Sequence, residues 1–142
     1  MNLGKKVAST LGALTAIAGL SLVNAPSAAA STPSGCSSVS QIGSTRVIQV
    51  GGTDAASVKQ YYGCGYNYAY IYVWQQFRDT HTNWDLYIRI VNESDSGNDY
   101  GAAQLTNTTR SELWGTPANT AAYCTHATGY LNSTGGSTST VC

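Results

Sequence analysis

The sequence has few charged side chains, and it has little of the residue chemistry on which enzymes and nucleic-acid-binding proteins depend. Only 10% of its 142 residues are charged, with seven basic against seven acidic, and there are two histidines. Lys5 and Lys6 stand near the amino terminus, so the rest of the chain has five basic and seven acidic residues. This balance leaves no basic patch for a phosphate backbone, and we expect no nucleic-acid partner.

The two histidines stand in no recognisable catalytic context. His81 lies in "RDTHTNW" and His126 in "CTHATGY", and neither stretch resembles a nucleophile elbow or another setting of a serine triad. Three of the seven acidic residues lie within residues 93–99, in a predicted Gly-, Ser- and Asn-rich turn. A solvated hairpin loop explains this cluster more simply than the carboxylate pair of a glycosidase. We therefore expect a protein that is not an enzyme.

Metal and cofactor motifs are also missing. The stretch "NESDSGND", residues 92–99, is rich in oxygen ligands, but it lacks the regular alternation and the closing glutamate of an EF-hand. No glycine-rich turn leads into a predicted helix, as a phosphate-binding loop requires. No two cysteines stand close together, which disfavours zinc. We expect no cofactor and no metal, although ion binding by the turn stays open.

Residues 1–30 have the pattern of a secretory signal peptide. Lys5 and Lys6 precede the mostly apolar residues 7–23, and three alanines ending at Ala30 form a small-residue cleavage site. Serines and threonines interrupt the apolar run, which is shorter than the roughly 20 residues of a transmembrane helix. We predict a secreted, extracellular protein that begins near Ser31 and has no membrane association after cleavage.

Four cysteines in an exported chain predict two disulfides, with three ways to pair them. They are Cys36, Cys64, Cys124 and Cys142. We favour Cys36 with Cys64 and Cys124 with Cys142, because each pair would flank one arm or tail of the chain. The terminal Cys142 would keep the tail "NSTGGSTSTVC" from fraying. The other two pairings stay open.

The hydrophobic pattern repeats every two residues, which indicates β-strands. Alternation within residues 84–91 gives one apolar face, made of Trp84, Leu86, Ile88 and Ile90. β-Branched and aromatic runs bounded by glycine or turn residues predict strands at 45–50, 56–62, 66–77, 84–91 and 121–131, with weaker candidates at 100–107 and 111–114. The only helical candidate, 108–114, is short. We predict an all-β fold, a small antiparallel β-sandwich.

The predicted mature chain divides into an arm and a domain. Removing 30 of the 142 residues leaves 112, the length of one domain. Residues 31–44 consist almost wholly of small and polar residues, which predicts a flexible, extended N-terminal arm. Residues 45–142 form the predicted β domain. A domain of this size is only moderately stable on its core alone, so disulfides would contribute materially.

The stretch "YNYAYIYVWQQF", residues 66–77, has two contrasting faces. Asn67, Ala69, Ile71 and Val73 share one face, which has the composition of a core. The other face carries Tyr66, Tyr68, Tyr70, Tyr72 and Trp74. Amphipathic rings of this kind are enriched at interfaces, so we predict a partner-binding surface there. If a second layer covers the tyrosines, they belong to the core instead, and the sequence leaves both alternatives open.

Several stretches together resemble a known group of proteins. They are the Ala-rich leader, "ASVKQYYGCGYNYAYIYVWQQF", "SELW", "AYCTHATGY" and the terminal cysteine. In these the chain is similar to the small secreted actinobacterial adaptor subunit of umbrella toxin particles. The resemblance implies a non-enzymatic adaptor in an extracellular antibacterial particle. Its arm and β domain would join a lectin subunit to a large toxin polypeptide, so its partners would be other secreted proteins.

Two functions from other classes compete with the adaptor. A secreted enzyme inhibitor would present a rigid loop, for which residues 93–99 are the candidate. A free-standing carbohydrate-binding protein would use Trp84, Trp114 and the tyrosines. Co-purification with a toxin chain, a hydrolase or a polysaccharide distinguishes the three.

Overall fold

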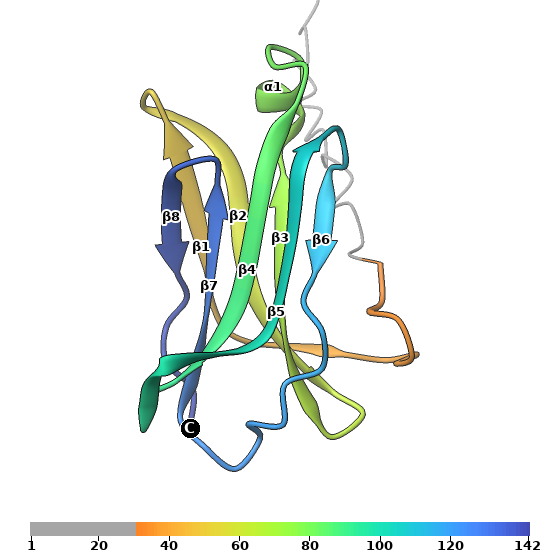
Figure 1. Ribbon diagram of the computed structural model, residues 1–142, viewed down its shortest axis with the longest axis vertical. Coiled ribbons are helices and arrows are strands. Elements are labelled where there is room, and N and C mark those ends of the chain that lie inside the picture. The colour runs from red at the N-terminus through yellow and green to blue at the C-terminus, as the bar shows by residue number, and fades with distance from the viewer. Residues whose placement is uncertain (1–30) are drawn as a thin grey trace, which may run out of the picture. The chain divides into compact units, whose positions relative to one another are not determined.

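Residues 31–142 form two antiparallel β-sheets packed face to face in the computed structural model, which describes these residues and leaves the predicted signal peptide, 1–30, outside its description (Figure 1). The elements are β1 (Ser40–Val50), β2 (Thr53–Gly63), β3 (Tyr66–Val73), α1 (Gln75–Arg78), β4 (Trp84–Asn92), β5 (Asp95–Thr108), β6 (Glu112–Trp114), β7 (Thr125–Leu131) and β8 (Thr134–Ser137). The predicted all-β sandwich is confirmed.

The order of the strands explains how the two sheets form. One sheet has the order β1-β2-β3-β6 and the other β5-β4-β7-β8, with every neighbouring pair antiparallel. Two-residue turns with positive φ connect β1 to β2, at Gly51 and Gly52, and β2 to β3, at Cys64 and Gly65. Such turns match the right-handed twist of the strands they join. The first three strands therefore form a continuous meander.

The core lies between the sheets and follows the predicted alternation. In β4, Trp84, Leu86, Ile88 and Ile90 are all buried. Ile71 and Val73 of β3 are also fully buried and belong to the same core cluster. Burying a side chain of this size contributes roughly 1.5–3 kcal/mol. The predicted dry faces of both strands are confirmed.

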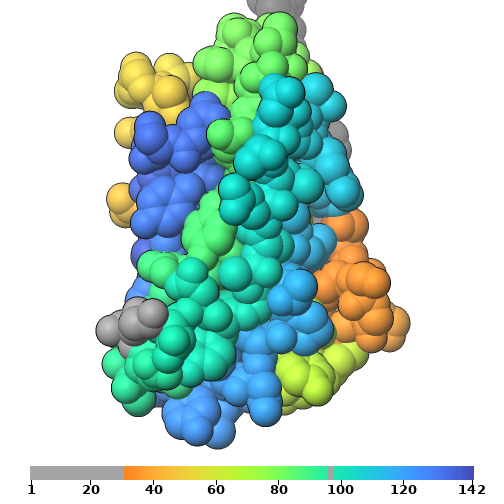
Figure 2. All heavy atoms as spheres, in the orientation of Figure 1, coloured from red at the N-terminus to blue at the C-terminus, as the bar shows by residue number. Residues whose placement is uncertain are grey.

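The favoured disulfide pairing is also confirmed. Cys36 is bonded to Cys64, and Cys124 to Cys142. The first bridge ties the segment before β1 to the β2–β3 turn, and space-filling shows residues 31–39, in orange, beside that yellow-green turn (Figure 2). The second ties the last residue to the residue before β7. Closing such loops contributes roughly 2–4 kcal/mol for each bridge.

Strand β1 begins at Ser40, five residues earlier than expected. Residues 40–44 were expected to belong to a flexible arm, but Ser40 and Ile42 are paired with β2. A bulge at Gly43, where φ is +68°, interrupts the pairing before Arg46. A side-chain β-carbon at Gly43 would lie 2.8 Å from a methyl carbon of Val141, so only glycine fits there. The absence of a side chain at Gly43 lets the C-terminal tail pack closely against β1.

The bulge also contacts the C-terminal tail that follows β8. The backbone N–H of Ser44 donates to the hydroxyl of Ser139, and the N–H of Ser139 donates to the hydroxyl of Ser44, both at 2.9 Å. Beside it, Thr125 and Val141 form an isolated antiparallel bridge. These contacts hold the C-terminal tail against both sheets.

Other strand boundaries differ from the prediction near the ends of the sheets. The aromatic strand ends at Val73, where α1 follows, instead of continuing to residue 77. The last predicted strand begins at Thr125 instead of residue 121, and β8 was not predicted. The helical candidate 108–114 is wrong, whereas the weaker strand candidate 111–114 corresponds to the short strand β6, which pairs with β3. Pairing between distant segments decides these boundaries.

Candidate partner-binding surface

Tyr68 and Tyr70, two of the tyrosines expected to face a partner, are buried. Each is 2% exposed, and both rings contact Trp114 of β6. The ring centroids of Tyr70 and Trp114 are 4.5 Å apart, and Tyr61 of β2 lies 5.0 Å from Trp114. The expectation of an open ridge is therefore wrong for these two residues. We refer to Tyr61, Tyr68, Tyr70 and Trp114 as the aromatic cluster.

Two residues of the aromatic cluster, Tyr70 and Trp114, make side-chain hydrogen bonds. The Tyr70 hydroxyl donates to Oε2 of Glu112 at 2.8 Å, and the Trp114 indole N–H donates to the Ser31 hydroxyl at 2.9 Å. The Ser31 hydroxyl in turn donates to Oε1 of Glu112 at 2.5 Å. Burial raises the pKa of the Tyr70 phenol, and the Glu112 carboxylate raises it further. Tyr70 therefore remains neutral and serves as a donor.

The remaining residues of the predicted surface lie in three different settings. Tyr66, at the start of β3, is 40% exposed. Tyr72 is half-buried, and the Arg78 guanidinium lies 5.9 Å from its ring centroid, close enough for a cation–π contact. Trp74, the N-cap of α1, is also half-buried. Of the five predicted residues, only Tyr66 is therefore broadly accessible.

Three tyrosines remain exposed, and they gather at one end of the sandwich. Tyr62 is 44% exposed, Tyr66 40% and Tyr123 51%, and no other large hydrophobic side chain within residues 31–142 is as exposed. Tyr62 and Tyr66 flank the β2–β3 turn, and Tyr123 precedes the disulfide at Cys124. We call these three residues the tyrosine end; it corresponds to the lower end of the ribbon (Figure 1).

Sequence analysis missed Tyr62 and Tyr123. Tyr62 follows Tyr61 in a predicted strand, so the side chains of these two residues were already expected to point to opposite faces of the sheet. Tyr123 is adjacent to a cysteine in a segment that was expected to be a strand. Their positions beside a turn and beside a disulfide could have identified them, because side chains at strand ends and in loops are more often exposed than those within a sheet.

A hollow of about 210 Å³ lies at the tyrosine end. Two of the three exposed tyrosines border it, and one amide, Asn67, lies in its wall. The lining residues are Ile42, Tyr62, Asn67, Ala121, Tyr123, Thr125, Val141 and Cys142. These come from β1, β2, β3 and both sides of the second disulfide, so the bridge fixes part of the wall. A hollow with apolar walls and few polar groups is suited to receiving a protruding side chain.

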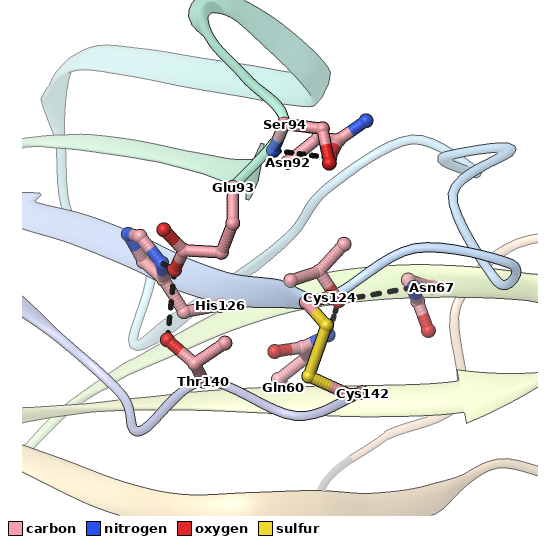
Figure 3. Close-up of a disulfide and its surroundings, with 10 residues drawn as sticks. Gln60, Asn67, Asn92, Glu93, Ser94, Cys124, His126, Thr140 and Cys142 are labelled. Atoms are coloured by element: carbon pink, nitrogen blue, oxygen red, sulfur yellow. Dashed lines mark hydrogen bonds and ion pairs between the residues drawn. A yellow bond between two sulfur atoms is a disulfide. The ribbon is translucent and has the colours of Figure 1, made fainter.

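A buried polar network supports the hollow (Figure 3). The Asn67 amide donates to the hydroxyl of Thr120 at 3.0 Å and to that of Thr125 at 3.3 Å. The Gln60 amide donates to the Thr125 hydroxyl at 2.7 Å. All four side chains are at most 3% exposed. Thr120 belongs to the loop that carries Tyr123, so its hydrogen bond from Asn67 ties this loop to β3.

A second polar cluster fastens the tail at the same end. Nδ1 of His126 lies 2.6 Å from Oε1 of Glu93, and the Thr140 hydroxyl donates to the same oxygen at 2.7 Å (Figure 3). The hydrogen bonds from Thr140 and His126 lower the pKa of Glu93. The acid lies between the imidazole and the hydroxyl, whereas a hydrolytic triad needs the imidazole in the middle.

His81 lies elsewhere and packs as a structural residue. Its ring is stacked on Phe77 with centroids 3.7 Å apart, and its Nδ1 lies 2.9 Å from the Phe77 carbonyl oxygen. The Thr80 hydroxyl, 3.0 Å away, approaches the same nitrogen. Both polar contacts involve Nδ1 of the imidazole, and they attach His81 to the end of α1.

The expectation of a hairpin loop over residues 93–99 is wrong for most of this segment, because β5 begins at Asp95 and only residues 93 and 94 form the turn. The carboxylates of Asp95 and Asp99 accept hydrogen bonds from donors of the chain itself. Tyr100 and Asn98 donate to Asp95, and these bonds lower the pKa of Asp95, with Tyr100 the larger cause. Tyr87 and Arg89 donate to Asp99 and lower its pKa, with Tyr87 the larger cause. Within residues 31–142 no group of three or more His, Cys, Asp or Glu side chains is arranged to hold a metal ion.

The same part of the chain contains no helix that is long and apolar enough to cross a membrane. Comparisons with known proteins gave no match: no family model, no curated protein and no solved structure matches the chain. The geometry defines a small β-sandwich with two disulfides, whose exposed aromatic side chains lie at one end.

Proposed function

We propose that this protein is a secreted, non-enzymatic protein-interaction subunit whose tyrosine end binds another secreted protein. The observation that carries the proposal is the exposure of Tyr62, Tyr66 and Tyr123 at the disulfide-linked end, where Tyr62 and Tyr123 border a hollow. Tyrosine supplies large amphipathic contact area and loses little conformational freedom on binding. Bridges and buried hydrogen bonds pre-organise the surface, which lowers the entropic cost of association.

Within this proposal, the partners are a large toxin polypeptide and a lectin subunit, which the protein joins as an adaptor of an extracellular antibacterial particle. The support is the resemblance of the aromatic and cysteine-containing stretches to umbrella toxin adaptors. The two disulfides support secretion, since such bonds persist in oxidising compartments.

An adaptor needs a second surface, and the outer edges of β1 and β8 supply a candidate. These strands end their respective sheets, and a hollow of about 440 Å³ lies between them. It is lined by residues 45–49 of β1 and by Thr134 and Gly135 of β8. A sheet edge presents unpaired main-chain groups, to which an extended peptide can add as a further strand.

Carbohydrate binding is the second candidate function, because aromatic side chains and the Asn67 amide converge on the same 210 Å³ hollow. The tryptophans contribute less than expected: Trp84 is 4% exposed and its indole N–H donates to the Arg110 carbonyl. Trp114 is half-buried in the aromatic cluster. Any sugar site would therefore depend on the tyrosines.

Affinity purification from culture supernatant tests the proposal. Tagged mature protein should retain a large toxin chain or a lectin subunit, identified by mass spectrometry. The triple substitution Tyr62→Ser, Tyr66→Ser and Tyr123→Ser should abolish this retention, whereas Tyr130→Ser, on the outer face of β7, should not. Retention of a hydrolase or a polysaccharide in place of those proteins would reject the adaptor. Equal retention by the triple variant would reject the tyrosine end.

A further inference from the structure

Ser31, the residue after the predicted cleavage site, is attached to the aromatic cluster. Its hydroxyl bridges the Glu112 carboxylate and the Trp114 indole, residues that follow it by more than 80 positions. Pro33 is buried and Cys36 is bonded to Cys64, so the following segment is also held against the first sheet. The start of the predicted mature chain thus occupies a defined position.

The backbone nitrogen of Ser31 must therefore lie close to the Glu112 carboxylate. Nitrogen and hydroxyl oxygen of a serine are joined through only two carbons, which keeps them about 3 Å apart. The Ser31 hydroxyl lies 2.5 Å from Oε1 of Glu112. Together these distances place the nitrogen within about 6 Å of the carboxylate, a range in which opposite charges interact.

Glu112 is a carboxylate without a cationic partner in the described part of the chain. It accepts hydrogen bonds from Tyr70 and Ser31. The two ion pairs within residues 31–142 join Arg89 to Asp99 and His126 to Glu93, and neither involves Glu112. A half-buried carboxylate is suited to an ammonium group, with which it can form a charge-assisted hydrogen bond.

We propose that the Glu112 carboxylate, oriented by the Tyr70 hydroxyl, binds the α-ammonium group that signal-peptide cleavage creates on Ser31, whose side chain the Trp114 indole holds in place. In the precursor this nitrogen belongs to a neutral amide. Hydrolysis of the Ala30–Ser31 peptide bond releases it as an amine, which is protonated at neutral pH. The resulting ion pair fastens residues 31–39 over the aromatic cluster and closes this face of the first sheet.

The proposal concerns maturation and does not depend on which partner the tyrosine end binds. It rests on cleavage after Ala30, so the first measurement is the N-terminal sequence of the secreted protein. A mature chain that begins with Ser31 is the expected result. A different first residue would place the ammonium group elsewhere and overturn the inference.

Selective acetylation provides the main test, because Lys59 is the only lysine in residues 31–142. In a Lys59→Arg background the α-amine is the only primary amine, so an acetylating reagent removes that one charge. Acetylation should lower the melting temperature by about 4 °C, the shift expected for about 1 kcal/mol in a domain of this size. The same treatment of the Glu112→Gln variant should change it by less than about 1 °C, because the anionic partner is absent.

Two further variants make the comparison specific. Asp54→Asn, on the hairpin between β1 and β2, removes a carboxylate elsewhere and should leave the full acetylation effect. Glu112→Asp keeps the charge and should retain part of the effect, even if Glu112→Gln proves too unstable to study. An equal shift on acetylation in the parent, the Glu112→Gln variant and the Asp54→Asn variant would overturn the inference. So would the absence of any shift in the Lys59→Arg parent.

Discussion

Trp114 lies directly opposite Tyr70 where β6 pairs with β3, and their ring centroids are 4.5 Å apart. Strand β6 has three residues, yet this pairing decides the environment of the tyrosine face. Opposed residues of neighbouring strands point to the same side of a sheet, so the indole necessarily covers the phenol. Tyrosines that would otherwise face solvent become a second packed layer outside the sandwich core.

Truncating Tyr70 should therefore destabilise the domain as strongly as truncating Ile71. Both side chains are at most 2% exposed. Ile71→Ala should reduce the free energy of unfolding by about 2–5 kcal/mol and Tyr70→Ala by about 3–5 kcal/mol, as buried large-to-small changes do. Urea denaturation measures both values. Tyr66→Ala serves as the exposed control, with a change within about 0.5 kcal/mol; a Tyr70 variant as stable as this control would contradict the packed cluster.

Alkaline pH should destabilise the protein in part through Tyr70. Burial and the neighbouring Glu112 raise the pKa of this phenol in the folded chain. In the unfolded chain the phenol has its ordinary pKa of about 10. The folded state thus binds more protons, and stability is lost as pH rises above about 10. Tyr70→Phe should lose less stability between pH 8 and pH 11 in urea titrations. Identical losses would show that the phenol does not ionise differently in the two states.

The folded protein should contain no free thiol. Its intact mass should be lower than that of the reduced chain by the hydrogens of two bridges, and alkylation without denaturant should modify no cysteine. Four reactive cysteines in the folded protein would contradict the observed bridges.

Removing the second bridge should loosen the tail. The double substitution Cys124→Ser and Cys142→Ser should reduce the free energy of unfolding by about 2–4 kcal/mol. Amide hydrogen exchange at Val141, whose N–H donates to the Thr125 carbonyl at 2.8 Å, should accelerate. Unchanged exchange would mean that the serine contacts at the β1 bulge alone hold the tail.

Replacing both histidines should leave biological activity essentially intact. His81 is stacked on Phe77 and His126 is paired with Glu93, so His81→Gln and His126→Gln remove packing and tail contacts. Under the proposed adaptor function, the toxin particle that contains the combined variant is compared with the wild-type particle in a growth-inhibition assay, with circular dichroism as the control for folding. A loss of about a thousandfold, which corresponds to roughly 4 kcal/mol of transition-state stabilisation, would instead indicate catalysis.

Patterns within short stretches of sequence predicted those features of the fold that depend on nearby residues. The alternation in residues 84–91 identified the buried face of β4, and cysteines flanking the arm and the tail indicated their pairing. The fate of Tyr68 and Tyr70 could not be predicted, because it depends on β6, more than 40 residues away in the sequence. Residues 40–42 were misjudged for the same reason, because their place in a strand depends on main-chain pairing with residues 60–62 of β2.

The two disulfides determine which parts of the chain can bear mechanical load. Tension applied between the segment before Cys36 and the last residue passes through the sulfur atoms from Cys36 to Cys64 and from Cys124 to Cys142. Strands β1, β2, β7 and β8 lie within the two closed loops and cannot be pulled out lengthwise while the bridges last. Only residues 65–123 can extend, so the covalent links limit how far the protein lengthens when it is stretched.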